Sequence, residues 1–273
     1  MDATNIFSNS HQIPLARKGY NNTMTFDRQF NLMYIYSADS RMPVYYRLLP
    51  GNIKEVKAFK NCLLEAGLRK AIVIADKGFY SQKNIDLLEE EKLKYIIPLK
   101  RDNTLINYKD LAENTFKQKN SYFEHEGRVI WYRRYKTNNK QNLYLYLDES
   151  LRLKEEHDYI RRVSSIPESY SMEVYHQKRN VFGTIALMAN LKKSKEIDVY
   201  QAYKSRMFIE VMFDGMKNVM EADHTYMQDE QTLQGWMFVN HIVLQWYQSL
   251  YIEFKQKSLL KKYSVNDYIN ILT

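Results

Sequence analysis

The segment KAIVIAD, residues 70–76, largely decides which fold this sequence can adopt. Its short apolar run is bounded by charged residues, a pattern typical of a β-strand that is buried on both faces of a sheet. The elements predicted around it alternate as β-β-α-β-α-β: hairpin strands at 31–36 and 43–48, a helix from 52 to 66, this strand, a helix at 82–91 and a strand at 94–99. Such an alternation predicts the α/β fold class.

The pattern changes after Pro98. Residues 121–147 contain alternating strand segments that predict a β-meander. Residues 182–190 return to the buried-strand pattern, and two helices are predicted after them, at 196–221 and about 229–257. The chain is therefore expected to consist of a first core segment, a β-rich insertion and a second core segment with carboxyl-terminal helices, at 1–99, 100–181 and 182–273.

The charge balance bears on the class of binding partner. The 273 residues carry a formal net charge of +8, which favours a polyanion partner, since phosphate contacts supply most nonspecific nucleic-acid affinity. A lysine-rich solvated surface explains the same number equally well. Cys62 is the single cysteine, so the chain can form neither an internal disulfide nor a site with several cysteine ligands. With no signal peptide and no apolar run of membrane-spanning length, we expect a cytoplasmic protein.

A polar stripe stands out on the helix predicted over YKSRMFIEVMFDGMK, residues 203–217. At about 100° per residue, one narrow face collects Tyr203, Arg206, Glu210, Asp214 and Lys217, while most of the remaining surface is apolar. One interpretation is two surface ion pairs along the helix, Arg206 with Glu210 and Asp214 with Lys217. The other, which we favour, is a cleft where a carboxylate could bind a hard cation and basic groups could bind phosphate.

Two further carboxylates are candidates for the same chemistry. Asp76 follows a predicted strand, where open α/β sheets place their ligands, and Gly78 would let a ligand approach the backbone; a capping role for Asp76 is the alternative. Asp2 opens a polar, β-prone segment, and a disordered terminus is the alternative there. The sequence shows no histidines at metal-ligand spacing, no Ser or Cys nucleophile motif and no glycine-rich phosphate loop. Hydrolytic or transfer chemistry would therefore depend on carboxylates and metals.

The spacing Tyr203-x2-Arg206-x3-Glu210-x6-Lys217 resembles the Y-R-E-K signature of the DDE transposases of bacterial and archaeal insertion sequences. The segment IADKGF is similar to the region around that family's second catalytic Asp, and MDATNIFSNS is similar to its first-Asp segment. RLLPGNIKE at 47–55 and FGTIALMAN at 182–190 also resemble family segments, in the expected order. The resemblance covers essentially the whole chain.

The resemblance implies a ribonuclease H-like mixed sheet flanked by helices and interrupted by a β-rich insertion. It implies a catalytic, metal-binding triad of Asp2, Asp76 and Glu210. It also implies DNA contacts from Tyr203, Arg206 and Lys217. The expected cofactor is Mg2+ or Mn2+, and the expected partners are double-stranded transposon ends and target DNA, bound by a homodimer on paired ends. The implied reaction is metal-dependent DNA cleavage and strand transfer by in-line attack on a phosphodiester.

One departure from the family concerns Asp2. In the family the first Asp ends a strand and a sizeable region precedes it, so the sequence predicts an amino-terminally truncated chain. We expect Asp2 to have little to hold it in place and the activity to be weak or absent, because a misplacement of about 1 Å can cost about 100-fold in rate.

The alternatives to transposase function are a non-catalytic DNA-binding remnant, a metal-dependent nuclease without strand transfer, and a structural α/β protein with chance spacing.

Overall fold

The computed structural model describes residues 1–19, 25, 27–53, 55–68, 71–137, 141–191 and 194–272. The chain forms two compact units. The terminal unit combines Met1–Arg69 with Lys204–Thr273, and the middle unit contains Lys70–Tyr203.

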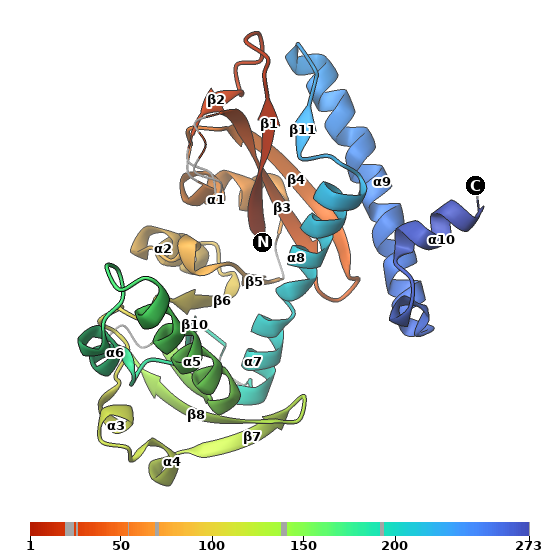
Figure 1. The fold of residues 1–273 in the computed structure, drawn as a ribbon. Helices are drawn as coiled ribbons and strands as arrows, with labels where there is room; N and C mark the ends of the chain where they lie inside the picture. The colour runs from red at the N-terminus through yellow and green to blue at the C-terminus, as the bar shows by residue number, and fades with distance from the viewer. Residues whose placement is uncertain are drawn as a thin grey trace. The chain divides into compact units, whose positions relative to one another are not determined.

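An antiparallel meander forms the centre of the terminal unit (Figure 1). Its strands are β1 (Asp2–Ser8), β2 (Arg17–Lys18), β3 (Arg28–Ser37), β4 (Met42–Pro50) and β11 (His224–Thr225). Strand β3 pairs with β1, β2 and β4, and β11 pairs in parallel with β1. The hairpin predicted over 31–36 and 43–48 is confirmed and extends a few residues at both ends.

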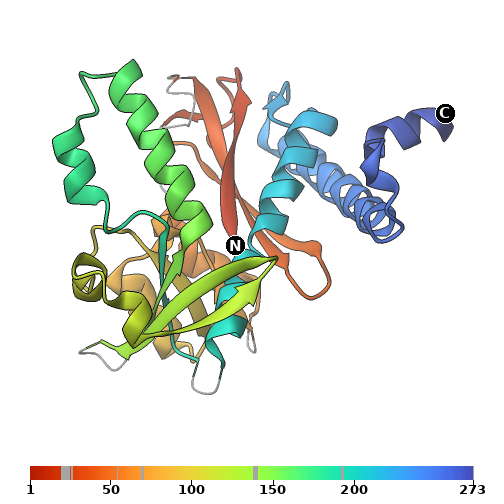
Figure 2. The same cartoon turned by 60° about the horizontal axis from the view of Figure 1, so that its bottom comes forward.

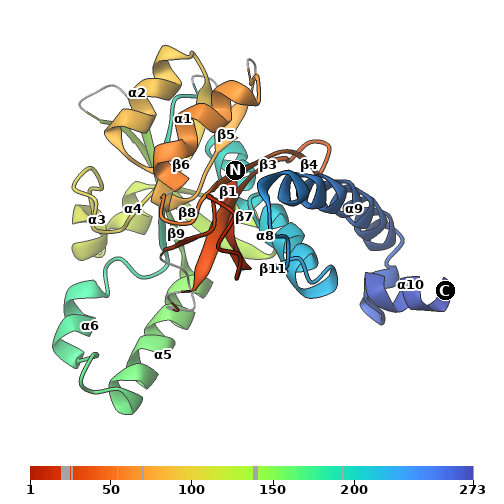
Figure 3. The same ribbon diagram turned by 90° about the horizontal axis from the view of Figure 1, so that it is seen from above.

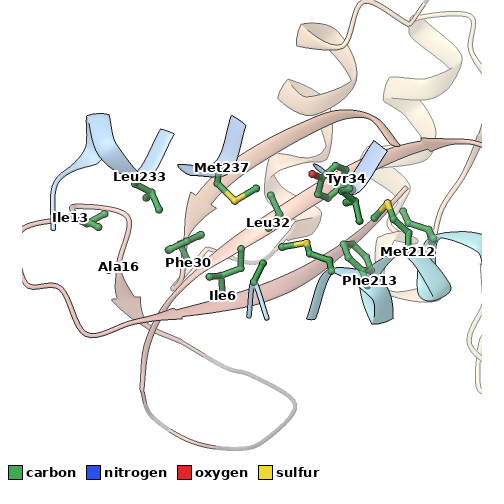
Figure 4. Packing of buried hydrophobic residues seen from close by; sticks show 14 residues of the cluster. Ile6, Ile13, Ala16, Phe30, Leu32, Tyr34, Met212, Phe213, Leu233 and Met237 are labelled. Atoms are coloured by element: carbon green, nitrogen blue, oxygen red, sulfur yellow. The ribbon is translucent and has the colours of Figure 1, made fainter. Parts of the chain in front are cut away.

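Helices α8 (Met207–Asp214) and α9 (Glu230–Gln256) pack on this sheet. Figure 4 shows the cluster, in which side chains from the strands, such as Ile6, Leu32 and Tyr34, meet side chains from α8 and α9. Figure 3 shows α8 and α9 side by side. The buried residues of α9 recur every three or four positions, at Leu233, Met237, His241, Leu244 and Gln248. This periodicity is that of an amphipathic helix, so the helix predicted at 229–257 is confirmed.

The remaining helical segments of the terminal unit are α1 (Glu55–Glu65), the π-helical turn η2 (Gly215–Val219), the 3-10 turn η3 (Leu259–Lys261) and α10 (Val265–Leu272).

The prediction of one continuous helix over 196–221 is wrong, because the helix is interrupted. The chain forms α7 (Glu196–Lys204), a turn at 205–206, α8 and then η2. At the first break the amides of Phe208 and Ile209 donate to carbonyls three residues back instead of four. At the second break the amide of Met220 donates to the Gly215 carbonyl, five residues back. Both changes alter the rotation per residue that the sequence analysis assumed.

The middle unit contains a mixed six-stranded sheet in the order β5-β6-β10-β9-β8-β7. These strands are β5 (Ile72–Ile74), β6 (Lys94–Leu99), β7 (Ser121–His125), β8 (Arg128–Lys136), β9 (Asn142–Asp148) and β10 (Thr184–Ala189). Strands β5 and β6 are parallel, and the other neighbours are antiparallel. The predicted meander is confirmed as β7-β8-β9, and the β7–β8 hairpin is yellow-green in Figure 2. The predicted buried strand at 182–190 is confirmed as β10.

The helices of the middle unit are α2 (Gln82–Glu90), α3 (Lys109–Ala112), α4 (Phe116–Lys119), α5 (Glu149–Ser165), α6 (Met172–Lys178) and α7, with a 3-10 turn η1 (Lys77–Phe79) after β5.

Burial differs from the prediction at β5. Ile72 is 46% exposed, because β5 lies at the edge of its sheet, so the expected burial on both faces is wrong. Strand β9, in the interior of the same sheet, is the one buried along its whole length. The α/β class is nevertheless confirmed, since mixed sheets carry helices in the order that the sequence predicted. The division at 1–99, 100–181 and 182–273 stays a prediction.

No helix in the described part of the chain is long and apolar enough to cross a membrane.

Candidate functional site

Three of the predicted site residues meet in the terminal unit. Arg206 Nη1 donates a hydrogen bond of 3.0 Å to Oδ2 of Asp2, and Arg206 Nη2 donates one of 2.5 Å to Oε1 of Glu210. The side chains of Asp2 and Arg206 are 19% and 18% exposed, whereas that of Glu210 is 53% exposed. One guanidinium therefore joins two carboxylates that lie 208 positions apart in the chain, and the group opens to solvent on the Glu210 side.

Local structure explains how each member of this group is positioned. Asp2 begins β1, pairs across the sheet with Tyr34, and accepts a hydrogen bond of 2.9 Å from the Ala3 amide through its own Oδ1. Arg206 stands just before α8, and Glu210 lies four residues later, one helical turn along. The expectation that Asp2 has little to hold it is wrong, because strand pairing and Arg206 both fix its position.

Within the described residues, no group of three or more His, Cys, Asp or Glu side chains is placed to hold a metal ion. The donor set of Asp2 and Glu210 nevertheless suits a hard divalent cation, which prefers carboxylate oxygens. Both carboxylates accept a hydrogen bond from the same positive group, the Arg206 guanidinium. The structure thus provides two oxygen ligands at one place, and any third carboxylate has to come from another part of the chain.

Asp76 belongs to the middle unit, directly after β5. It precedes the turn η1, and its carbonyl accepts a hydrogen bond of 2.9 Å from the Phe79 amide. Its side chain makes no capping hydrogen bond to this turn, so the structure does not support the capping interpretation. Gly78 is exposed, and a Cβ atom there would meet nothing within 4 Å. Packing within the chain therefore gives no reason for a glycine at this position.

Lys217 is half-buried in the π-helical turn η2. Burial lowers the pKa of its ammonium group, and the Asp223 carboxylate opposes this effect. Within the described residues Lys217 has no ion pair. The expected pairing with Asp214 is wrong, because Asp214 Oδ1 instead accepts a hydrogen bond of 2.6 Å from Asn218 Nδ2. A cationic group that is partly removed from water and lacks a carboxylate partner is suited to bind an anion.

Gly215, at the start of the π-helical turn, makes a close contact that the sequence did not predict. Gly215 begins the turn and is buried against Tyr247 of α9. A Cβ atom at Gly215 would lie 2.4 Å from Cε1 of Tyr247, closer than any real side chain allows. The glycine therefore lets the turn approach α9 closely, and Lys217 lies two residues further along the same turn. The only sequence signal was a glycine inside a helical pattern.

Tyr203 is the last residue of the middle unit. It packs, partly buried, against the aromatic cluster that contains Tyr146 and Tyr200. The stripe predicted on one helix is therefore divided by the structure. Arg206 and Glu210 join Asp2, Lys217 sits in the π-helical turn, and Tyr203 belongs to the other unit.

Residues 1–246 match the family described as "Transposase DDE domain". Among solved structures, the chain is similar to one described as "Cryo-EM structure of piggyBac transposase synaptic complex with hairpin DNA", with 10% sequence identity and a TM-score of 0.47. That similarity covers 99% of this chain and 50% of the solved one, so this chain spans about half the length of that protein. No curated protein matches the chain.

Proposed function

This chain belongs to the transposase DDE domain family, and on that basis we propose that it cleaves DNA at the ends of an insertion sequence and joins the cut strand to target DNA. The observation that carries the proposal is the Asp2–Arg206–Glu210 group, because the first and third residues implied as catalytic meet on one unit. Their meeting does not follow from spacing, since they lie far apart in the chain. The expected loss of activity also loses its physical reason, because Asp2 is held in a paired strand.

We propose that Asp2, Asp76 and Glu210 are the metal-binding triad, for Mg2+ or Mn2+. The oxygen donors of Asp2 and Glu210 fit such cations, and the part of Asp76 rests on the sequence resemblance alone. Divalent cations bound there would stabilise negative charge at the reacting phosphodiester and lower the pKa of a water ligand. The protein contributes two fixed carboxylates, one of them open to solvent, where a DNA strand can approach.

Arg206 has a double role in this proposal. Without DNA, its guanidinium balances the two carboxylates and keeps them together. A guanidinium has five N–H donors, so Arg206 can donate to a phosphate oxygen while it keeps a bond to Asp2. The resemblance assigns Lys217 and Tyr203 to DNA as well. The half-buried ammonium of Lys217, which makes no ion pair among the described residues, supports the assignment for that residue. A ribonuclease H-like core, a homodimer on paired ends and a cytoplasmic location complete the proposal.

Calorimetry tests the metal site. Mn2+ is titrated into the purified chain in the presence of a short DNA duplex, and the wild type is compared with Asp2→Asn, Asp76→Asn and Glu210→Gln. Glu253→Gln is the matched control, because Glu253 is an exposed helical carboxylate that pairs with Lys257. We expect each of the three site variants to lose Mn2+ binding and the control to keep it.

Two results would contradict the proposal in different ways. If all four variants bind Mn2+ as the wild type does, the triad assignment fails. If the wild type binds the duplex but no Mn2+, the chain is a DNA-binding protein without a catalytic centre.

A further inference from the structure

The tip of the β3–β4 hairpin and the last turns of α9 bring two cationic side chains to one aromatic ring of the terminal unit. The guanidinium carbon of Arg41 lies 5.3 Å from the centre of the Phe208 ring, and Lys255 Nζ lies 5.6 Å from the same centre. Lys255 Nζ also lies 5.8 Å from the ring centre of Tyr251, one turn earlier on α9. The orange loop between β3 and β4 runs beside α9 in Figures 1 and 3, and Gln245 of α9 donates a hydrogen bond of 3.0 Å to the Pro43 carbonyl.

Both cationic side chains are exposed. Within the described residues, neither Arg41 nor Lys255 makes an ion pair. The neighbouring Lys257 differs, because its Nζ lies 2.6 Å from a carboxylate oxygen of Glu253. Two like charges near one ring repel each other, and the ring attracts each of them by only about 0.5–1 kcal/mol at an exposed site. Phosphate groups bound at these two cations would offset this repulsion.

The backbone of Arg41 points to a role for its side chain. Its φ angle is 55°, in the left-handed region. A residue with a Cβ atom pays about 1–2 kcal/mol for this conformation, whereas glycine adopts it freely. The turn would therefore tolerate glycine better than arginine. Arginine at this position keeps the conformational penalty of the left-handed backbone, and it places a guanidinium over the Phe208 ring.

This cluster does not belong to the Asp2–Arg206–Glu210 group. Phe208 and Glu210 are two residues apart on α8, so their side chains leave the helix about 160° apart. With its side chains an α-helix is about 10–12 Å across. A phosphate bound at Arg41 and Lys255 is therefore not the phosphate that reacts at Glu210.

We propose that Arg41 and Lys255 form a second phosphate-binding site, which holds the sugar–phosphate backbone of duplex DNA on the side of α8 away from Glu210. This inference rests on the proposed function, because it takes DNA as the polyanion. Arginine and lysine contacts to phosphate carry no base information. The site accordingly accepts the backbone of either a transposon end or a target duplex.

The test measures duplex affinity as a function of salt by fluorescence anisotropy. The variants are Arg41→Gly, Lys255→Gln and the double variant, and Lys257→Gln is the matched control for a general loss of charge. Glycine suits the left-handed backbone at position 41, so this variant should fold, and its thermal unfolding verifies that. Two labelled duplexes are used, one with the terminal inverted repeat that flanks the coding sequence and one of unrelated sequence.

We expect each single variant to reduce the magnitude of the slope of log affinity against log salt by about 0.9, and the double variant by about 2. The control should leave the slope unchanged. Equal losses on both duplexes would support a backbone site open to target DNA, and a loss confined to the inverted repeat would support a phosphate site that serves transposon ends. If the wild type binds and the double variant keeps the wild-type slope on both duplexes, the second site is overturned. If the wild type binds neither duplex, the proposed function fails as well.

Discussion

The contact between Gly215 and Tyr247 gives a quantitative prediction about the π-helical turn. Alanine is favoured over glycine inside a helix by about 1 kcal/mol, so a Gly→Ala change normally stabilises. At Gly215 the new methyl group would lie 2.4 Å from Cε1 and 3.0 Å from both Cδ1 and Cζ of Tyr247. Overpacking of this kind costs about 1–3 kcal/mol. We therefore expect Gly215→Ala to lower the free energy of unfolding by about 0–2 kcal/mol.

Gly235 provides the matched control, since it lies in α9 of the same unit and a Cβ atom there would meet nothing within 4 Å. Gly235→Ala should raise the free energy of unfolding by about 1 kcal/mol. Urea denaturation of both variants reports the difference, which should be about 1–3 kcal/mol. A second Tyr247→Ala change should remove the penalty at Gly215 but not alter the gain at Gly235. The reasoning is refuted if Gly215→Ala stabilises the protein as much as Gly235→Ala does.

Three further predictions concern titration and capping. Burial lowers the pKa of Lys217 below its unfolded value, so its charge destabilises the folded state at neutral pH. This cost disappears as the pH rises from the lowered pKa toward 10.5, the unfolded value. Lys217→Met should therefore stabilise the protein at neutral pH, and this gain should shrink over that pH range. Burial also lowers the pKa of His241, whose Nδ1 lies 3.2 Å from the Tyr34 hydroxyl oxygen. The terminal unit should therefore lose stability as the pH falls below about 6.5. In acid denaturation, His241→Gln should weaken that loss. Asp148 is buried, accepts a hydrogen bond from the Leu151 amide at the start of α5 and pairs with Arg128 at 2.8 Å. Asp148→Ala should therefore lower the free energy of unfolding by about 3–5 kcal/mol in urea denaturation. A loss below about 1 kcal/mol would contradict the assigned contacts.

Elements governed by local pattern were predictable from the sequence. The hairpin strands β3 and β4 have strong β-formers on both sides of a polar turn, and α9 repeats its apolar residues at helical spacing. The Arg206–Glu210 contact also follows from i,i+4 spacing. These features depend on residues close together in the chain, so a single sequence contains the information they need.

Features that depend on distant partners were not predictable. Ile72 has the apolar character of a buried strand residue, but its exposure depends on whether another strand covers the edge of the sheet. The close packing at Gly215 involves the ring of Tyr247, 32 residues later and on another helix. The bond from Arg206 to Asp2 joins the two chain segments of the terminal unit. The spacing of residues in the sequence identified the candidate site residues. That Asp2 and Glu210, two of the three candidate carboxylates, lie close together follows only from the fold.

The most direct test of the account is DNA cleavage and strand transfer on a duplex with the terminal inverted repeat in Mn2+, followed on a gel. Asp2→Asn and Glu210→Gln are compared with Glu253→Gln, an exposed helical carboxylate outside the site. The account predicts that the wild type and the control yield both products, whereas each site variant loses at least about 100-fold in rate but still binds the duplex. Wild-type rates in Asp2→Asn and Glu210→Gln would show that the Asp2–Arg206–Glu210 group is not the catalytic site.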